Sequence, residues 1–146
     1  MSETAALRKL TAEDIEFLID LRDELNTQDT VCQADPRFWV VLTHENETCW
    51  EGNAEWFDIV RDSDGQCIGR APYEDETQGL SFVPMRERER IAENTMFLTL
   101  RECKEHIKAN HYHYKDPISY AMTAWRSPQV EKLWKILQEV DWGRLK

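Results

Sequence analysis

The densest group of reactive side chains lies between residues 103 and 113, where one thiol and three imidazoles occur close together. These residues are Cys103, His106, His111 and His113. Thiolate sulfur and imidazole nitrogen are preferred ligands of zinc, so the set is a candidate metal site of a metal-dependent enzyme. Cys103 and His106 share one helical face, and the other two histidines follow a predicted helix end where the chain can fold back. The spacing matches no recurring zinc motif, and the alternative is that Cys103 packs against Leu98 without metal.

A second candidate site overlaps the first and combines stacking, hydrogen-bonding and cationic groups. Its residues are His111, Tyr112, His113, Tyr114, Tyr120, Trp125 and Arg126. Bases stack on aromatic rings and basic side chains bind phosphate, so this segment is typical of a site for a nucleotide or a nucleotide-derived signal. The alternative is that these rings lie in the core and expose only their polar tips.

The sequence holds none of the motifs that position common catalytic groups. A Gly-rich phosphate loop, a G-x-S-x-G elbow and an H-E-x-x-H pair are all absent. Cys32 becomes a nucleophile only where a histidine approaches it in space, and a structural cysteine is the alternative. We therefore expect binding rather than catalysis and assign no catalytic residue.

Length and composition predict one soluble domain over residues 1–146. The chain is 41% hydrophobic, which is enough for a single core. We expect no membrane segment, because no apolar run approaches the roughly 18 residues that a span needs, and no secretion leader at the start. The four widely spaced cysteines are typical of buried free thiols in a reducing cytoplasm.

The charge is negative and unevenly distributed. The chain has 18 basic and 28 acidic residues, a formal net charge of −10. Residues 1–79 carry 19 acidic and 6 basic side chains, whereas residues 80–146 carry 9 and 12. We expect the acidic half to repel nucleic acid and attract basic protein surfaces, unless its charge serves only solubility.

Three helix starts are marked by capping residues. Thr11 precedes Asp14, and Thr99 precedes Glu102, each as in a capping box. Ser127 precedes Pro128, the residue type best suited to the first helical position. The predicted helices cover about 12–26, 100–110 and 128–140.

Strand signals lie mainly between these helices. The predicted strands are 38–42, 54–61, 66–70 and 80–83, with a hairpin turn at Asp64-Gly65 and an end at Pro84. The alternating charges of Arg86 to Arg90 are expected to face solvent. This element order predicts an α+β fold in which about three helices pack on a small antiparallel sheet.

Two stretches near the chain ends carry family-like motifs. The first reads NTQDTVC at 26–32 and PRFWVV at 36–41; the second reads FLT at 97–99, HI at 106–107, NHYHY at 110–114, Pro117, Tyr120 and AWRSP at 124–128. In these stretches the chain resembles a family of small tailed-bacteriophage and prophage proteins. The resemblance implies an accessory protein that binds host machinery in the host cytoplasm, and it transfers no catalytic residue.

Three functional hypotheses follow. The first is a non-enzymatic phage protein that binds and modulates or inhibits a host protein, such as a defence factor. The second is a ligand-binding module that sequesters a nucleotide through the aromatic segment. The third is a metal-dependent enzyme with zinc at the Cys/His set.

Overall fold

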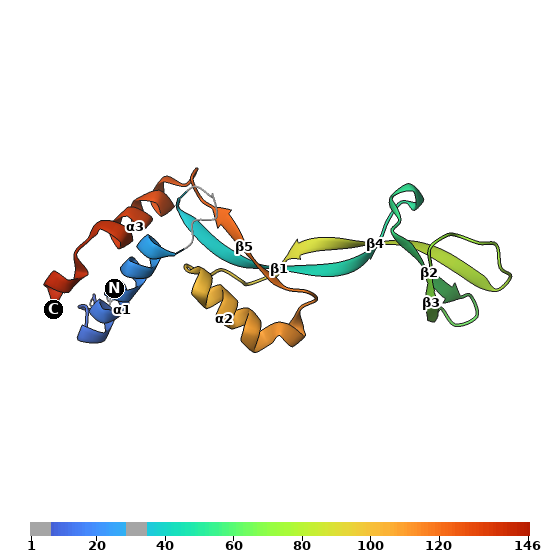
Figure 1. The fold of residues 1–146 in the computed structure, drawn as a ribbon, viewed down its shortest axis with the longest axis horizontal. Coiled ribbons are helices and arrows are strands. Elements are labelled where there is room, and N and C mark those ends of the chain that lie inside the picture. The colour runs from blue at the N-terminus through green and yellow to red at the C-terminus, as the bar shows by residue number, and fades with distance from the viewer. Residues whose placement is uncertain (1–6, 29–34) are drawn as a thin grey trace, which may run out of the picture.

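The computed structural model describes residues 7–28 and 35–146, which form three α-helices and one five-stranded antiparallel sheet (Figure 1). The helices are α1 (Ala12–Thr27), α2 (Leu100–Asn110) and α3 (Pro128–Glu139), with short 3-10 helices η1 (Glu51–Asn53), η2 (His111–His113) and η3 (Trp142–Leu145). The strands are β1 (Arg37–Thr48), β2 (Trp56–Arg61), β3 (Cys67–Ala71), β4 (Leu80–Ile91) and β5 (Ile118–Thr123), in the order β3-β2-β4-β1-β5. The predicted α+β class, with a small antiparallel sheet and about three helices, is confirmed.

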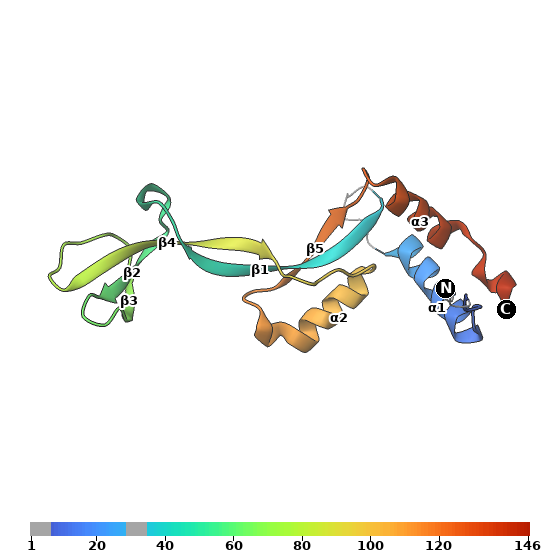
Figure 2. The same ribbon diagram turned by 180° about the vertical axis from the view of Figure 1, so that it is seen from behind.

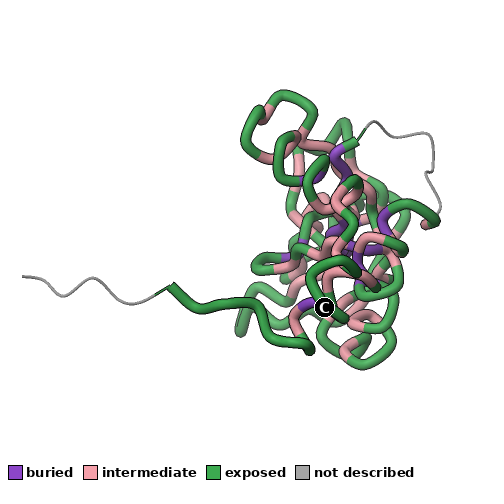
Figure 3. Tube along the Cα trace, turned by 90° about the vertical axis from the view of Figure 1, so that its left-hand side faces the viewer, coloured by how far each residue is buried: buried purple, intermediate pink, exposed green. Residues whose placement is uncertain are grey.

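The two long strands are staggered, so the sheet is elongated. β1 pairs with β4 only over 42–48 and 85–91. The first half of β1 pairs with β5, and the first half of β4 pairs with β2. Figures 1 and 2 show the result, a two-stranded ribbon that joins an end with three α-helices to an end without α-helices. Few segments are buried, and they are short (Figure 3).

A ladder of opposite charges holds the ribbon together. Arg86 Nε lies 2.6 Å from Glu47 Oε1, and Arg88 lies 3.4 Å from both Glu45 and Glu47. Arg90 Nε lies 3.3 Å from Glu45 Oε2. The expected exposure of these arginines is correct, and the residues belong to β4, beyond the predicted strand end. Cross-strand pairs of opposite charge substitute here for the apolar contacts that stabilise other strands.

β4 continues through Pro84, so the predicted strand end there is wrong. The N and O atoms of one residue point to the same side of a strand. The Pro84 carbonyl accepts from the Cys49 N–H at 3.0 Å, just beyond the last β1 residue. The missing N–H of Pro84 therefore faces the side where β1 has already ended, and no ladder hydrogen bond is lost.

The main core lies between α2 and one face of the sheet. Trp39, Val41, Ala92 and Cys103 are buried there, and Ile107 packs against them together with other partly buried side chains. β5 was not among the predicted strands, and it forms the edge of the sheet under α2.

Helices α1 and α3 pack on each other instead of on the strands, unlike the expected packing on the sheet. Trp134 of α3 is 4% exposed, and Ile15, Leu21 and Leu25 of α1 are buried. The α1 end is joined to α2 because Gln28 Oε1 accepts the Leu100 N–H at 3.0 Å. None of the helices in the described part of the chain could cross a lipid bilayer.

The predicted helix starts are confirmed. Thr11 Oγ1 accepts the Asp14 N–H, and Asp14 Oδ2 accepts the Thr11 N–H at 2.9 Å, which completes a capping box. The hydrogen bond from the Thr11 backbone is the largest of the effects that lower the pKa of Asp14. Thr99 Oγ1 accepts the Glu102 N–H, whereas Ser127 precedes Pro128 without a side-chain cap.

Candidate functional site

The four proposed zinc ligands lie in different surroundings. Cys103 is fully buried, and its thiol donates to the Val40 carbonyl oxygen at 3.5 Å. Burial is also the main cause that raises the pKa of this thiol. His111 and His113 are exposed on η2. Within residues 7–28 and 35–146 no three His, Cys, Asp or Glu side chains are grouped to hold a metal, so the structure does not bring the four together.

His106 is engaged in protein contacts through both ring nitrogens. Its Nε2 lies 2.9 Å from Tyr114 Oη, and its Nδ1 lies 3.3 Å from Asn110 Nδ2. Because an amide nitrogen only donates, Nδ1 accepts and Nε2 carries the proton that it donates to Tyr114. The ring also packs on Phe97, with 5.0 Å between centroids. These contacts fix η2 against α2.

The seven proposed ligand-binding residues lie in three places. His111, Tyr112 and His113 form an exposed row on η2, in which the rings of Tyr112 and His113 are 4.2 Å apart. Tyr114 packs against the core. Three others lie farther along the chain: Tyr120 on β5, followed by Trp125 and Arg126, whose guanidinium lies 4.4 Å from the Trp125 ring. β5 alone spans about 20 Å, so η2 and the Trp125 region lie at opposite ends of this strand.

A different group of exposed residues occupies the far end of the molecule. We call residues 49–79, which contain η1, β2, β3 and their connections, the tip (Figure 1). The tip exposes 74% of Trp50 and 80% of Tyr73. The predicted hairpin turn lies here, and Gly65 has a φ of 70° as such a turn requires. Neither aromatic residue was predicted as a site from the sequence, although each adjoins a glutamate in a stretch that also holds Gly52 or Pro72, as exposed turns commonly do.

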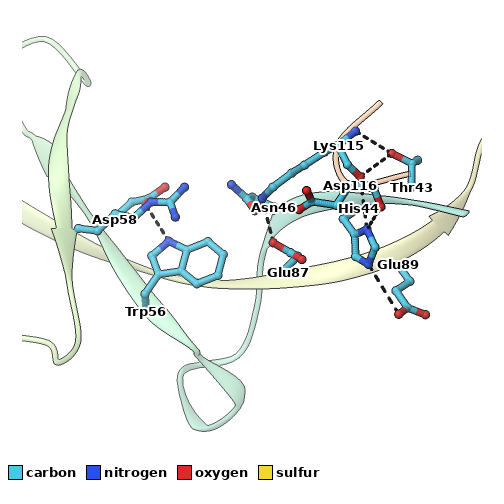
Figure 4. Close-up of polar contacts among 10 residues, drawn as sticks. Thr43, His44, Asn46, Trp56, Asp58, Glu87, Glu89, Lys115 and Asp116 are labelled. Atoms are coloured by element: carbon cyan, nitrogen blue, oxygen red, sulfur yellow. Dashed lines mark hydrogen bonds and ion pairs between the residues drawn. The ribbon is translucent and has the colours of Figure 1, made fainter. Parts of the chain in front are cut away.

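The tip carries surplus negative charge. It has 8 acidic and 2 basic residues, Arg61 and Arg70. Arg61 lies 3.2 Å from Asp64. Arg70 lies 3.7 Å from Asp58 and 4.6 Å from the Trp56 ring centroid. The Trp56 indole in turn donates to Asp58 at 2.9 Å, as Figure 4 shows. Both basic residues of the tip are therefore engaged inside it.

Six further carboxylates of the tip are exposed and form no ion pair with the described residues. They are Glu51, Glu55, Asp62, Glu74, Asp75 and Glu76. The last three line a hollow beside the start of β4. The uncompensated charge therefore lies near the same connections that carry the exposed aromatic rings.

The Trp50 ring lies directly against Gly52. A Cβ at Gly52 would overlap the indole, so only glycine allows this close approach. The ring is supported on one side by η1 and is open to solvent on the other.

The cysteines differ from one another in exposure. Cys67 lies exposed on the edge strand β3, contrary to the expected burial, while Cys49 is intermediate and Cys103 buried. Cys32, the proposed nucleophile, lies outside the described residues. No family model, no curated protein and no solved structure matches the chain.

Proposed function

We propose that the protein is a non-catalytic binding protein whose tip docks on a basic surface of a partner protein. The observation that carries this proposal is the exposure of Trp50 and Tyr73 among carboxylates that form no ion pair with the described residues. Trp and Tyr are enriched among the residues that dominate binding energy at interfaces. Uncompensated negative charge steers a protein toward basic surfaces and increases the rate of association.

The shape of the molecule supports this proposal. The ribbon of β1 and β4 holds the tip away from the helices, so a partner can contact the tip without meeting α1, α2 or α3 (Figure 2). The Trp50 ring lies against Gly52 and is otherwise open, so a partner can contact most of its surface.

The resemblance to phage proteins directs the search for the partner to bacterial host proteins. A basic groove that otherwise holds nucleic acid is a suitable surface, because its charge complements that of the tip. Occupation of such a groove blocks its nucleic acid, so inhibition of a host protein, such as a defence factor, follows from binding alone.

The nucleotide hypothesis receives less support from the structure. Its seven residues do not converge, whereas a sequestering pocket needs convergent polar groups. An exposed row of rings at His111 to His113 also suits a protein contact, so these residues serve as a comparison in the experiment.

The test is affinity capture from a nuclease-treated bacterial lysate with three forms of the tagged protein. These are the unaltered protein, a tip variant with Trp50→Ala and Tyr73→Ala, and a control with Tyr112→Ala and Trp125→Ala. The control removes two exposed aromatic residues from the other end of the chain. We expect one basic protein to be retained by the unaltered protein and the control, and lost from the tip variant.

Salt and a milder variant sharpen this test. The Debye length falls from about 10 Å in 0.1 M salt to about 3 Å in 1 M salt, so high salt should release the captured protein. With the purified partner, Gly52→Ala should weaken binding because it displaces the Trp50 ring. Equal retention by the tip variant and the unaltered protein, or equal loss from the control, would contradict the proposal.

A further inference from the structure

β5 turns part of its backbone away from the rest of the sheet. The Trp39 N–H and carbonyl both pair with Phe97 at 2.8 Å, so the backbone of Trp39 points away from β5. Val41, two residues farther along β1, points the same way. In an antiparallel pair the residues opposite such positions also point outward. These residues are Ala121, opposite Trp39, and Ser119, opposite Val41.

The outward groups of β5 have no partner in the fold. The backbone N–H and carbonyl groups of Ser119 and Ala121 form no hydrogen bond with residues 7–28 or 35–146. β5 borders the sheet, and an open groove separates it from α2 (Figure 1). Two donors and two acceptors are therefore available to another strand.

β5 also lacks the features that commonly protect a sheet edge, which are charged side chains, bulges and short length. At the opposite edge, the short strand β3 carries Arg70, and its register with β2 shifts between Ile59 and Val60. In the ribbon, β4 alternates arginine and glutamate over 86–90. Residues 117–125, by contrast, contain no charged side chain. β5 is therefore open to pairing where the other edges are not.

The side chains beside this edge are apolar and exposed. Ala121 packs against the core under α2, and successive side chains of a strand alternate between the two faces. Ile118, Tyr120 and Met122 therefore lie on the face opposite α2. Ile118 is 49% exposed and Tyr120 46%. A strand added to β5 would extend this apolar face as well as the hydrogen-bond ladder.

We propose that β5 pairs with β5 of a second copy of the chain, antiparallel and around a two-fold axis at Tyr120. Ser119 of each copy then lies opposite Ala121 of the other, so every unpaired N–H of the two strands meets a carbonyl. The two Tyr120 side chains face each other across the axis, and Ile118 lies opposite Met122. Aromatic and apolar cross-strand pairs of this kind stabilise a sheet.

The composition of the strand favours a second copy and this register. Copies with a net charge of −10 repel each other, but the uncharged strand brings no like charges together at the axis. A shift of the axis to Ser119 would place Pro117 opposite Ala121, and proline has no N–H to donate.

The size of the edge predicts a reversible dimer. β5 spans about 20 Å, and one strand pair of this length buries less than the roughly 800 Å² per partner of a standard interface. Because the joined strands run in opposite directions, the two ribbons leave the axis in opposite directions and both tips stay free. The inference is therefore independent of the partner proposed for the tip.

The first test is residue-resolved hydrogen exchange of the unaltered full chain by NMR, at micromolar and at millimolar protein. We expect the Ser119 and Ala121 amides to exchange fast in the dilute sample and slowly in the concentrated one. The Tyr120 amide, which faces β1, should be protected in both. Sedimentation velocity of the same samples should show a change from monomer to dimer.

Charge variants at the axis test the register. Tyr120→Glu and Tyr120→Lys should each weaken self-association at least about tenfold, because like charges then meet across the axis. An equal mixture of the two variants should restore the dimer, since opposite charges face each other. The matched control is Ile68→Glu on the other edge strand, where Ile68 is 47% exposed, and it should leave the dimer unchanged.

Four outcomes would overturn the proposal. Fast exchange of both amides in a protein that stays monomeric would show that the edge remains open. Protection of both amides in a monomer at every concentration would show that another part of the same chain covers β5. A dimer that survives both Tyr120 variants, or one that dissociates on Ile68→Glu, would place the interface elsewhere.

Discussion

The ammonium nitrogen of Lys115 lies 2.9 Å from Glu87 Oε2, and this ion pair ties the segment before β5 to the middle of β4 (Figure 4). The same ammonium donates to Asn46 Oδ1 at 2.8 Å. His44 adds a second link, because its Nδ1 donates to the Asp116 carbonyl oxygen at 3.1 Å. The ribbon is therefore anchored to the α2–β5 connection by side chains on β1 and β4.

The Lys115 ion pair makes part of the stability depend on pH. The hydrogen bond from Lys115 is the main cause that lowers the pKa of Glu87 below 4.5. A lowered carboxyl pKa contributes stability above the unfolded value, and the contribution is lost as pH falls through the folded value. We expect Lys115→Met to be less stable than the unaltered protein near pH 7 and the difference to shrink below pH 4.5.

Urea unfolding at a series of pH values measures this difference. Lys108→Met is the control, since Lys108 is exposed and forms no ion pair with the described residues. A stability gap that stays constant down to pH 3 would contradict the assigned role of Lys115.

The hairpin turn of the tip should depend on glycine at one position only. Gly65 has a φ of 70°, where a side chain is strained, so Gly65→Ala should cost about 1 kcal/mol. Gly69 has no such φ, and a Cβ there meets nothing within 4 Å. Gly69→Ala should therefore be neutral or stabilising by up to about 0.5 kcal/mol. Chemical denaturation followed by circular dichroism compares the two, and equal effects would contradict the turn geometry.

The packing of α1 on α3 should depend on Trp134. Trp134 is 4% exposed, so Trp134→Ala should lower the free energy of unfolding by about 3 kcal/mol or more. Leu133 is the neighbouring control, because it is 49% exposed and its replacement by Ala should cost about 1 kcal/mol or less. Thermal unfolding with a structural probe on α1 detects the loss. A smaller effect for Trp134 than for Leu133 would show that α3 packs through another face.

The cysteines should react in the order of their exposure. Cys67 is exposed, whereas Cys103 is fully buried and has a raised pKa, so iodoacetamide at pH 7.5 should modify Cys67 first. Peptide mass spectrometry after brief labelling gives the order. Modification of Cys103 at the rate of Cys67 in the folded protein would contradict the packing of α2 on the sheet. Denaturant should make both react.

The sequence predicts those features that depend on neighbouring residues. The caps at Thr11 and Thr99 and the turn at Gly65 are local, and each is where the pattern indicates. The second half of β1 and most of β4 escaped prediction because both strand faces are polar there. They are joined by backbone pairing and by ion pairs such as Arg86 with Glu47, between residues far apart in the chain.

The candidate sites were harder to predict for the same reason. Residues close in sequence, such as Tyr114 and Tyr120, lie in different surroundings, because Tyr114 packs against the core after η2 whereas Tyr120 is exposed on β5. The acidic excess of the first half is visible in the sequence, but the exposure of Trp50 depends on how its ring meets Gly52. The outward direction of the Ser119 and Ala121 backbone can be known only from the fold.

The stagger of β1 and β4 also fixes an order of assembly. In the strands of the tip, Trp56 pairs with Met85 of β4 and Phe57 pairs with Ala71 of β3, so these pairings close short loops. At the helical end, Arg37 of β1 pairs with Thr123 of β5. This pairing closes a much longer loop, which costs more chain entropy, and it can form only after nearly the whole sequence has been synthesised. On the ribosome, the tip strands therefore emerge complete while β1 still lacks its β5 partner. We expect the nascent chain to present a folded tip before its helical end exists.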